Sequence, residues 1–278
     1  MSDKKQATAS TTEEKPLTRR ERKRIAKKAT MLETAMSIIV EGGMEALTIA
    51  RLAERLDAAV GALYRYFPGK QALIVALQHQ CLEEYNEILR GHLAMAQTYL
   101  DEKPEGEVSA ASGFLLKLIT LSYSYILDAT ESPTRHRLMD MMISTPDPVL
   151  DDDEAREVGM TLMKILFQGT EILIEAEQSG AFRSSPALFS GTKPDTSLSA
   201  EDEIKQRAWQ RAHILWSHLH GLDHFRKRDR IQAPHLQVES LFQAGLRTLF
   251  LGWGAQPEAL EQAFGLFDTF VLSSWMAR

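Results

Sequence analysis

The chain has 278 residues, of which 44% are hydrophobic and 25% are charged, and its formal net charge is -6. This composition is that of a globular protein with one large or two modest domains. No stretch reaches the ~18 uncharged apolar residues of a membrane span, and the N-terminus has no apolar segment of the signal-peptide type. Cys81 is the one cysteine, which excludes an intrachain disulfide. We therefore expect a cytoplasmic protein.

The charge is unevenly distributed along the chain. Residues 1–80 contain 14 Lys and Arg against 9 Asp and Glu, a net charge of +5, and the remainder has a net charge of -11. A cationic N-terminal part on an acidic body indicates a local contact with a polyanion, because the body would repel nucleic acid. Eight basic residues lie between Lys15 and Lys28, with Glu21 as the one acid. The charges alone are equally consistent with a solvated, frayed arm.

The N-terminal segment is polar and is followed by a helical pattern. Residues 1–18 are rich in Ser, Thr, Lys and Glu, and we predict a disordered basic and polar tail because such a segment buries little apolar area. From Arg19 the apolar residues recur at steps of three and four, the spacing of one helix face. Gly42 and Gly43 end this helix, because glycine adopts the left-handed C-terminal conformation without penalty. The apolar positions are Ile25, Ala29, Leu32, Met36 and Ile39.

Two short helices are predicted next. Thr48 is a suitable N-cap for the first helix, and a second helix is predicted over residues 60–66 after a three-residue turn. Pro68 and Gly69 then break the chain. Two short helices, a tight turn and a supporting helix upstream describe a helix-turn-helix unit. The pattern alone also fits an ordinary helical hairpin in a bundle core.

The second short helix has a surface suited to duplex DNA. In a helix-turn-helix unit this helix lies in the major groove, where outward residues touch base edges and flanking residues hold phosphates. Small outward residues let the backbone approach the bases, Ala62 can contact a thymine methyl, and Arg65 can pair with a guanine edge or a phosphate. The hydroxyls of Tyr64 and Tyr66 can donate to phosphates, and Lys70 at a helix N-terminus suits a phosphate clamp. The outward residues are Val60, Gly61, Ala62, Tyr64 and Arg65.

The stretch from about Met31 to Ala76 resembles the DNA-binding domain of the TetR (tetracycline repressor-like) family. The family pattern is an Ala-bearing apolar helix and Gly-Gly, then Thr and a Leu-Ala pair, then Leu-Tyr-x-(His/Tyr)-Phe, and Lys before an apolar helix. A match at this density over about 46 residues is specific and favours DNA binding over a simple hairpin. The matching residues are Ala35, Gly42-Gly43, Thr48, Leu52-Ala53, Leu63-Tyr64-Arg65-Tyr66-Phe67 and Lys70-Gln71-Ala72-Leu73.

The chain departs from the family pattern at Asp57, Ala58 and Ala59, where the family usually has Gly, an aliphatic residue and Ser or Thr. Aspartate tolerates a left-handed turn better than most residues. Ala59 cannot cap the second helix, a loss that typically costs ~1 kcal/mol, unless Asp57 supplies the acceptor. Without an acceptor, we expect this helix to be loosely held until DNA binds.

The resemblance also gives a role to the basic run. It implies that the first helix lies along the DNA backbone and that an N-terminal extension can reach a neighbouring groove. The basic residues from Arg19 to Lys28 are therefore expected to contact phosphates or the minor groove, with a solvated helix end as the alternative for each. The predicted DNA-binding residues are Arg19, Arg20, Arg24, Lys28, Thr48, Val60, Gly61, Ala62, Tyr64, Arg65, Tyr66 and Lys70.

The rest of the chain is also predicted to be helical. Lys70 opens a long helix with a candidate interruption at Gly91, and no run alternates with a period of two, so the expected fold class is all-α. We predict a tail over 1–18, a helix-turn-helix domain over 19–77 and a ligand-binding and dimerisation domain over 78–278. The predicted C-terminal helices are 108–129, 132–145, 151–179, 201–226, 236–253 and 257–276.

The TetR resemblance implies that the C-terminal helices dimerise. The stretch Trp216–Leu222 is similar to a Trp/His/Gly-bearing helix of many members. The helices over 201–226 and 257–276 are apolar on more than one face, which favours burial of one face against a twin subunit. Burial in a large monomer core is the alternative. The predicted dimer-interface residues are Trp209, Ala212, Trp216, Leu219, Phe267 and Val271.

The resemblance also implies an apolar ligand pocket in the C-terminal part. Flexible Met and aromatic side chains between residues 108 and 179 suit an adaptable apolar cavity, although such residues at helical spacing are more often core. A ligand would be apolar or aromatic, with a few polar anchors. The candidate ligand-binding residues are Phe114, Leu118, Tyr123, Tyr125, Met139, Met142, Met160, Met163 and Phe167.

Metal binding and catalysis have weaker support. His220 and His224 are four residues apart with Asp223 nearby, a spacing that can bind a metal. The chain has no HExxH pattern and no Cys pair, so we assign these histidines a structural or interface role, predict no metal or cofactor, and leave the metal question open. No paired carboxylates, Gly-rich phosphate loop or Ser/His/Asp cluster supports an enzyme.

These observations predict a ligand-responsive transcription regulator, most simply a repressor. As a homodimer it would place two recognition helices ~34–36 Å apart, or a multiple of this distance, on a palindromic operator. An apolar or aromatic small molecule would release it by preferring a state with a different spacing. The alternative is a constitutive DNA-binding protein without a small-molecule ligand.

Overall fold

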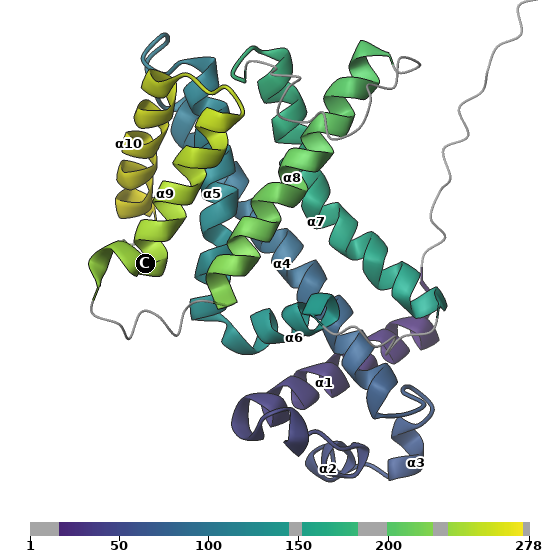
Figure 1. The fold of residues 1–278 in the computed structure, drawn as a ribbon. Coiled ribbons are helices and arrows are strands. Elements are labelled where there is room, and N and C mark those ends of the chain that lie inside the picture. The colour runs from purple at the N-terminus through teal and green to yellow at the C-terminus, as the bar shows by residue number, and fades with distance from the viewer. Residues whose placement is uncertain (1–16, 145–151, 183–198, 225–232, 275–278) are drawn as a thin grey trace, which may run out of the picture. The chain divides into compact units, whose positions relative to one another are not determined.

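The computed structural model describes residues 17–144, 152–182, 199–224 and 233–274 (Figure 1). Within these ranges every regular element is a helix, which confirms the predicted all-α fold. One isolated antiparallel bridge in the same ranges joins Phe182 to Ala255. The chain forms two compact units, and the boundary between Ile74 and Val75 lies inside a long helix. The first unit contains α1 (Arg19–Gly42), η1 (Met44–Ala46), α2 (Ile49–Arg55), α3 (Val60–Leu63) and the start of α4 (Lys70–Asp101).

Helix α1 has the predicted bounds, but only its second half is buried. A capping box starts it: the Thr18 N–H donates to the Glu21 carboxylate (2.7 Å), and the Glu21 N–H donates to the Thr18 hydroxyl (3.2 Å). Residues 19–30 are exposed all round, so the prediction that Ile25 lies on the inner face is wrong; its side chain is 54% exposed. The buried face starts at Met31 and consists of Met31, Leu32, Ala35, Ile38 and Ile39.

The turn after α2 uses aspartate in place of glycine. The Thr48 hydroxyl accepts a hydrogen bond from the Arg51 N–H (3.1 Å), which confirms the predicted N-cap. At the other end of α2, Asp57 has a φ of 48°, and the N–H of Ala58 donates to the Ala53 carbonyl (2.9 Å). This pattern is a Schellman motif, in which glycine is the usual left-handed residue. Asp57 therefore fills the position that the family pattern gives to glycine.

Helix α3 spans only Val60–Leu63, so the prediction of a helix through Tyr66 is wrong. The N–H groups of Tyr66 and Phe67 both donate to the Leu63 carbonyl (2.8 and 2.9 Å), which closes the helix in a tight turn. Pro68 contributes, because the residue before a proline disfavours helical geometry. Leu63 and Phe67 are 0% and 2% exposed and anchor the end of α3 in the first unit.

No side chain caps α3 at Ala59, so Asp57 does not supply the missing acceptor. Ala59 nevertheless has the extended backbone of an N-cap (φ -66°, ψ 134°). We expect Ala59→Ser to stabilise α3 by ~1 kcal/mol, because the serine hydroxyl accepts from a free N–H of the first turn. Amide hydrogen exchange at Gly61 and Ala62 should slow by about fivefold.

The matched control for Ala59→Ser is Ala50→Ser, which changes an exposed residue inside α2. Serine gains no capping hydrogen bond there and is a weaker helix former than alanine. Exchange in α3 should be unchanged in this control. Equal exchange rates in α3 for Ala59→Ser and the wild-type chain would contradict the missing-cap interpretation.

The second unit continues α4 without a break, so the predicted interruption at Gly91 is wrong. A single glycine inside a helix costs only ~1 kcal/mol, and the neighbouring Leu89 is buried (1% exposed), so packing maintains the helix. The other elements of this unit are α5 (Ala110–Glu131), α6 (Pro133–Ser144), α7 (Asp152–Gln178), α8 (Ala200–His224), η4 (Pro234–Leu236), α9 (Val238–Gly252) and α10 (Pro257–Ser274).

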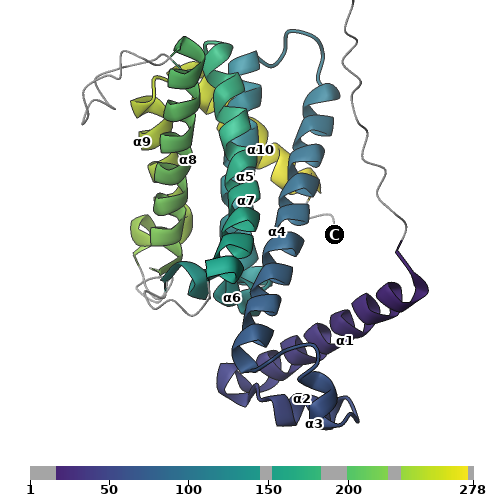
Figure 2. The same ribbon diagram turned by 90° about the vertical axis from the view of Figure 1, so that its right-hand side faces the viewer.

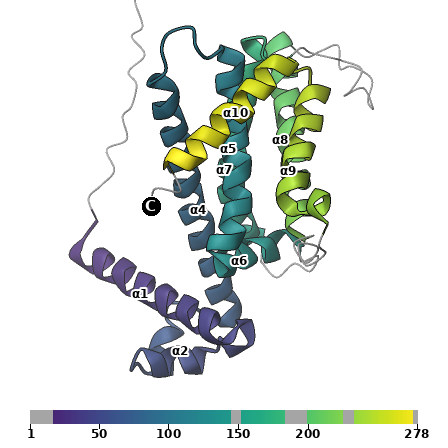
Figure 3. The same ribbon diagram turned by 90° about the vertical axis from the view of Figure 1, so that its left-hand side faces the viewer.

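Helix α5 is the central helix of the second unit. It packs against α6, α7, α8 and α10; Figure 2 shows α7 alongside it, and Figure 3 shows α10 crossing it obliquely. Among the described helices, α5 is long and apolar enough to cross a membrane by length and composition alone. Leu115, Leu118 and Ile119 of this helix are all 0% exposed, as in the core helix of a globular unit.

A buried ion pair joins α7 to α8. Arg211 donates from Nη1 to Oε2 of Glu177 (2.6 Å), and Arg207 donates from Nε to Oε1 of the same carboxylate (2.8 Å). The Arg211 side chain is 0% exposed, and its guanidinium lies 5.1 Å from the ring centroid of Phe182 and 5.8 Å from that of Trp253. The carboxylate and the two aromatic rings thus surround a charge that has no contact with solvent.

We expect Glu177→Ala to lower the free energy of unfolding by ~3–5 kcal/mol, because it leaves the Arg211 guanidinium buried without its counter-charge. Urea denaturation followed by circular dichroism measures this change. The control is Glu261→Ala, which removes the ion pair between Arg247 and Glu261 (2.9 Å), where the Glu261 side chain is 63% exposed. An exposed pair contributes ~0–1 kcal/mol. Equal losses in the two variants would contradict the structural role of the buried pair.

Candidate functional site

The outward face of α3 is open to solvent. Val60 and Tyr64 are 42% and 50% exposed, and Gly61 and Arg65 are also exposed. A Cβ atom added to Gly61 would meet no other atom within 4 Å. Glycine at this position is therefore not required by the packing of the first unit. The two other residues predicted for this face, Ala62 and Tyr66, are half-buried.

The basic residues of α1 form an exposed arm. Arg19, Arg20, Arg24 and Lys28 all lie in the segment 19–30, which is exposed on every side. The Lys28 ammonium lies 5.9 Å from the ring centroid of Phe67, the aromatic residue that closes the turn after α3. The C-terminal end of the arm therefore lies beside the turn that follows α3 within the first unit.

Two predicted phosphate contacts also have a role inside the first unit. The Lys70 ammonium donates to the Met44 carbonyl (3.2 Å) and is half-buried. Thr48 uses its hydroxyl to cap α2 by accepting from the Arg51 N–H. These hydrogen bonds position the turn before α2 and the start of α4. Contact of either side chain with a phosphate stays a prediction.

The second unit contains a partly open cavity with a volume of about 70 Å³ between α4, α5, α6, α7 and α8. Its wall is mostly aliphatic, and its polar atoms come from Tyr85, Tyr125, His136 and Asp140. The arrangement suits an apolar molecule with one polar end. The lining residues are Leu82, Tyr85, Leu89, Leu121, Tyr125, His136, Met139, Asp140, Leu162, Ile165, Leu166, Gly169, Leu173, Ala212, Leu215, Trp216 and Leu219.

Two of the ligand-binding candidates from the sequence, Tyr125 and Met139, line this cavity, and the other candidates whose side chains are described do not. Leu118 is 0% exposed in the core, and Tyr123 packs edge-on against Phe242 and Phe267. Phe167 is 49% exposed and packs edge-on against Trp209. Phe114 and Met163 are half-buried elsewhere, and the side chain of Met142 lies outside the described residues.

The sequence prediction and the cavity agree on the helices but share only Tyr125 and Met139 among the described side chains. It chose candidates by residue type, favouring Met and aromatic side chains. The cavity wall of α7 instead follows an aliphatic stripe at helical spacing that contains a glycine: Leu162, Leu166, Gly169 and Leu173. A glycine within an aliphatic stripe leaves unfilled space on that face, and this signal was present in the sequence.

The predicted dimer residues are partly unavailable to a second chain. Ala212, Leu219 and Phe267 are 3–5% exposed in the core of the second unit, and this burial leaves them almost no surface for a partner. Trp216 lines the cavity. The remaining two residues, Trp209 and Val271, are half-buried. The stripe of α8 that the sequence assigned to a twin subunit is therefore largely the chain's own core.

The polar end of the cavity contains a histidine between two carboxylates. His136 Nδ1 lies 3.4 Å from Oδ2 of Asp128, and its Nε2 lies 3.2 Å from Oδ2 of Asp223. Burial by itself lowers the pKa of His136, but Asp128 and Asp223 raise it, and the result is a pKa of about 9. Arg135 also pairs with Asp128. His136 is therefore an imidazolium at neutral pH.

The raised pKa predicts a pH dependence of stability. An unfolded histidine has a pKa of about 6.5, so the folded chain binds the extra proton more tightly. The stabilisation is fully present below about pH 6.5 and is lost as the pH rises through about 9. An NMR titration of the imidazole Cε1–H, assigned with His136→Gln, should give a midpoint near 9. A midpoint near 6.5 would contradict the interpretation that Asp128 and Asp223 keep His136 protonated.

Known proteins share the N-terminal segment of this chain. The family model for bacterial regulatory proteins of the tetR family matches residues 31–77. The likeness to the tetR family is therefore shown for residues 31–77. The HTH-type transcriptional repressor KstR of Mycolicibacterium smegmatis is 47% identical over 58 residues, which are 21% of this chain and 26% of KstR. The chain thus spans about a quarter of the length of the curated relatives it matches.

Solved structures share the fold over most of the chain. A protein of unknown function from Rhodococcus sp. RHA1 has a TM-score of 0.55 at 19% identity and covers 82% of this chain and 95% of its own. The regulator FadR from Bacillus subtilis, in complex with stearoyl-CoA, has a TM-score of 0.50 at 14% identity and covers 81% and 98%. At these identities the likeness concerns the fold alone.

Proposed function

We propose that this protein is a DNA-binding transcriptional repressor, acting in the cytoplasm as a homodimer on a palindromic operator and released by an apolar small molecule. The observation that carries this proposal is the TetR-family match over residues 31–77, which includes α2, α3 and the buried half of α1. The KstR relative is named as a transcriptional repressor, which supports repression over activation. The same comparisons support a regulator rather than an enzyme.

The proposed DNA contacts divide into two kinds. The exposed face of α3 reads base edges, because its small residues let the helix approach the groove floor and Arg65 can reach a guanine. The basic arm of α1 neutralises phosphates, which adds affinity without sequence preference. In a symmetric dimer, two copies of α3 would meet successive major grooves.

The proposed effector site is the cavity of the second unit. Its wall is apolar, with polar atoms from Tyr85, Tyr125, His136 and Asp140, so we infer an apolar effector with a polar end. FadR of Bacillus subtilis, which has the same fold, contains stearoyl-CoA. The cavity is smaller than the ~300–1,000 Å³ of pockets that hold drug-sized ligands. A larger effector would therefore have to separate the helices around the cavity.

Separation of these helices provides the proposed switch. Helix α4 begins in the DNA-binding unit, and its residues Leu82, Tyr85 and Leu89 line the cavity. An effector that prefers the expanded cavity would displace α4 and shift the population away from the DNA-binding state. The shift is limited by the difference between the effector's affinities for the two states.

For the dimer, we infer an interface formed by the solvent-facing sides of α8 and α9. These two helices pack together, and each keeps one large apolar side chain exposed, Ile214 (41%) and Leu251 (44%). Selection of bound duplexes from a random pool tests the assembly, because a dimer requires two inverted half-sites. Failure to retain any duplex at low salt would overturn the proposed function.

A substitution at Gly61 tests the recognition face against the selected duplex. Gly61→Ala adds a methyl group that meets no protein atom, and alanine favours a helix by ~0.5–1 kcal/mol over glycine. We expect stability to rise slightly, while affinity falls by about tenfold or more because the methyl separates α3 from the base edges. Fluorescence anisotropy with a labelled duplex measures the affinity.

The control for Gly61→Ala is Gly91→Ala in α4, where an added Cβ also meets no atom within 4 Å. Gly91→Ala stabilises its helix by the same amount, at a position outside the proposed DNA-binding face. Its affinity for the duplex should equal that of the wild-type chain. If Gly61→Ala binds as tightly as Gly91→Ala, another surface of the first unit contacts the bases.

A further inference from the structure

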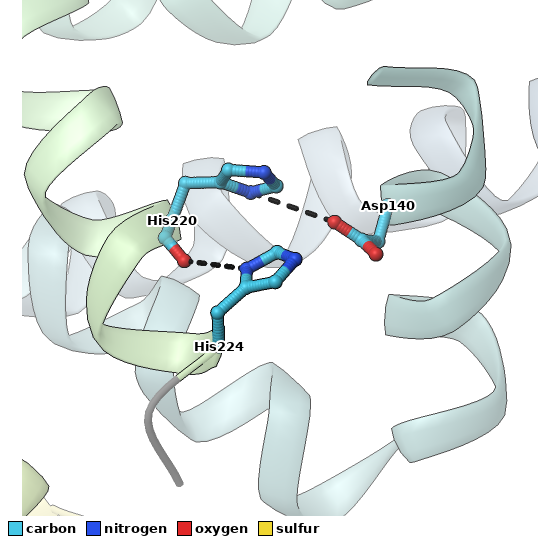
Figure 4. A group of neighbouring side chains, drawn as sticks. All are labelled: Asp140, His220 and His224. Atoms are coloured by element: carbon cyan, nitrogen blue, oxygen red, sulfur yellow. Dashed lines mark hydrogen bonds and ion pairs between the residues drawn. The ribbon is translucent and has the colours of Figure 1, made fainter. Parts of the chain in front are cut away.

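Three side chains with metal-binding atoms meet beside the cavity, at the end of α8 (Figure 4). Asp140 comes from α6, and His220 and His224 come from α8. One oxygen or nitrogen atom from each residue lies within 4.8 Å of the other two. Figure 4 shows the carboxylate directed toward both imidazole rings. The group combines two nitrogen donors with one oxygen donor.

The helical spacing of the histidines places both rings on one side of α8. Residues four apart are neighbours on a helix surface, and the two ring centroids are 4.6 Å apart. His224 Nδ1 lies 2.9 Å from the His220 carbonyl. A carbonyl oxygen only accepts hydrogen bonds, so Nδ1 of His224 carries the proton and the Nε2 lone pair of the neutral ring is available to a metal.

The acidic partner differs from the one expected from the sequence. Asp223 lies next to His224 in the chain, but its carboxylate pairs with His136 (3.2 Å). Asp140 takes its place, with Oδ1 lying 3.5 Å from Nδ1 of His220. The sequence could not indicate this residue, because the contact depends on how α6 packs in the second unit.

One of the donor distances already agrees with coordination of an ion, and the three donors lie within 4.8 Å of one another. Zinc binds His nitrogen and Asp oxygen atoms at ~2.0–2.2 Å in a tetrahedral arrangement, which separates neighbouring donor atoms by ~3.4 Å. The His220–Asp140 separation of 3.5 Å already has this value. His224 is exposed at the end of α8, so rotation of its side chain can bring Nε2 closer to the other two donors.

We propose that Asp140, His220 and His224 bind a divalent transition-metal ion of the zinc class. Two imidazoles with one carboxylate suit Zn²⁺, Co²⁺ or Ni²⁺, whereas Mg²⁺ and Ca²⁺ prefer all-oxygen sites. Three protein ligands leave a coordination position open for water or another small ligand. The Tyr125 hydroxyl lies 3.1 Å from His220 Nδ1, and an ion bound at this nitrogen would replace that hydrogen bond.

The ion would cross-link two walls of the cavity. Asp140 belongs to α6, which also contributes His136 and Met139 to the cavity, and α8 contributes Trp216 and Leu219. The Trp216 ring stacks on His220, with a centroid distance of 5.4 Å. An ion that joins α6 to α8 therefore stabilises the cavity wall, because it binds the folded chain and not the unfolded one.

The test uses the full-length chain without a histidine tag, stripped of metal with a chelator and titrated with Zn²⁺ by calorimetry. We expect one ion per chain and a rise in the thermal unfolding temperature. Co²⁺ should produce the visible absorption of a site with mixed nitrogen and oxygen ligands. His224→Ala and Asp140→Asn should each weaken binding by more than about 100-fold, because loss even of outer-shell partners costs about 10–100-fold.

The matched control is His213→Ala, on the same helix. His213 is exposed, and its Nδ1 lies 2.7 Å from the Trp209 carbonyl, the same local hydrogen bond that His224 makes with His220. This variant should bind Zn²⁺ like the wild-type chain. No stoichiometric binding, or equal binding by the His224→Ala and His213→Ala variants, would overturn the proposal. The measurement needs neither DNA nor effector, so it stands apart from the proposed function.

Discussion

The packing of α8 against α7 depends on the buried ion pair between Arg211 of α8 and Glu177 of α7. A guanidinium without solvent contact is tolerated only where other groups replace its hydration. Here the carboxylate, the Phe182 ring and the Trp253 ring do so. A slip of α8 by one turn would separate the charges by about 5.4 Å, so the pair sets the register of α8 against α7. The facing residues of these helices, including Leu173 and Leu215, line the cavity.

Because its register is set, α8 can serve several purposes along its length. Ala208 and Leu222 pack into the core, Leu215 and Leu219 line the cavity, and the two histidines at the C-terminal end meet Asp140. Helix α6 also contributes to both sites. Met139 lines the cavity, and Asp140 lies beside the two histidines. Ligand and metal would therefore act on the same pair of helices, and a change in the position of α6 would affect both.

The sequence predicted local features well and long-range contacts poorly. Apolar periodicity and glycines located α1 to the residue, and the Thr48 cap and the Asp57 turn are confirmed because each depends on a few neighbouring residues. The predicted length of α3 was wrong, because the helix closes where the Leu63 carbonyl accepts two hydrogen bonds. The spacing of apolar residues does not indicate such a turn. Burial of Ala212 and Leu219 and the meeting of Asp140 with His220 depend on packing between segments distant in the chain.

Helix α3 is a short element that is held in place by its two ends. Four residues are too few for a helix to be stable alone, and α3 has no side-chain cap. Its start is set by the left-handed turn at Asp57, and its end by the buried Leu63 and Phe67. None of these residues belongs to the exposed face. Under the proposed function, residues on that face can therefore change the bases that are recognised without loss of the framework that presents them.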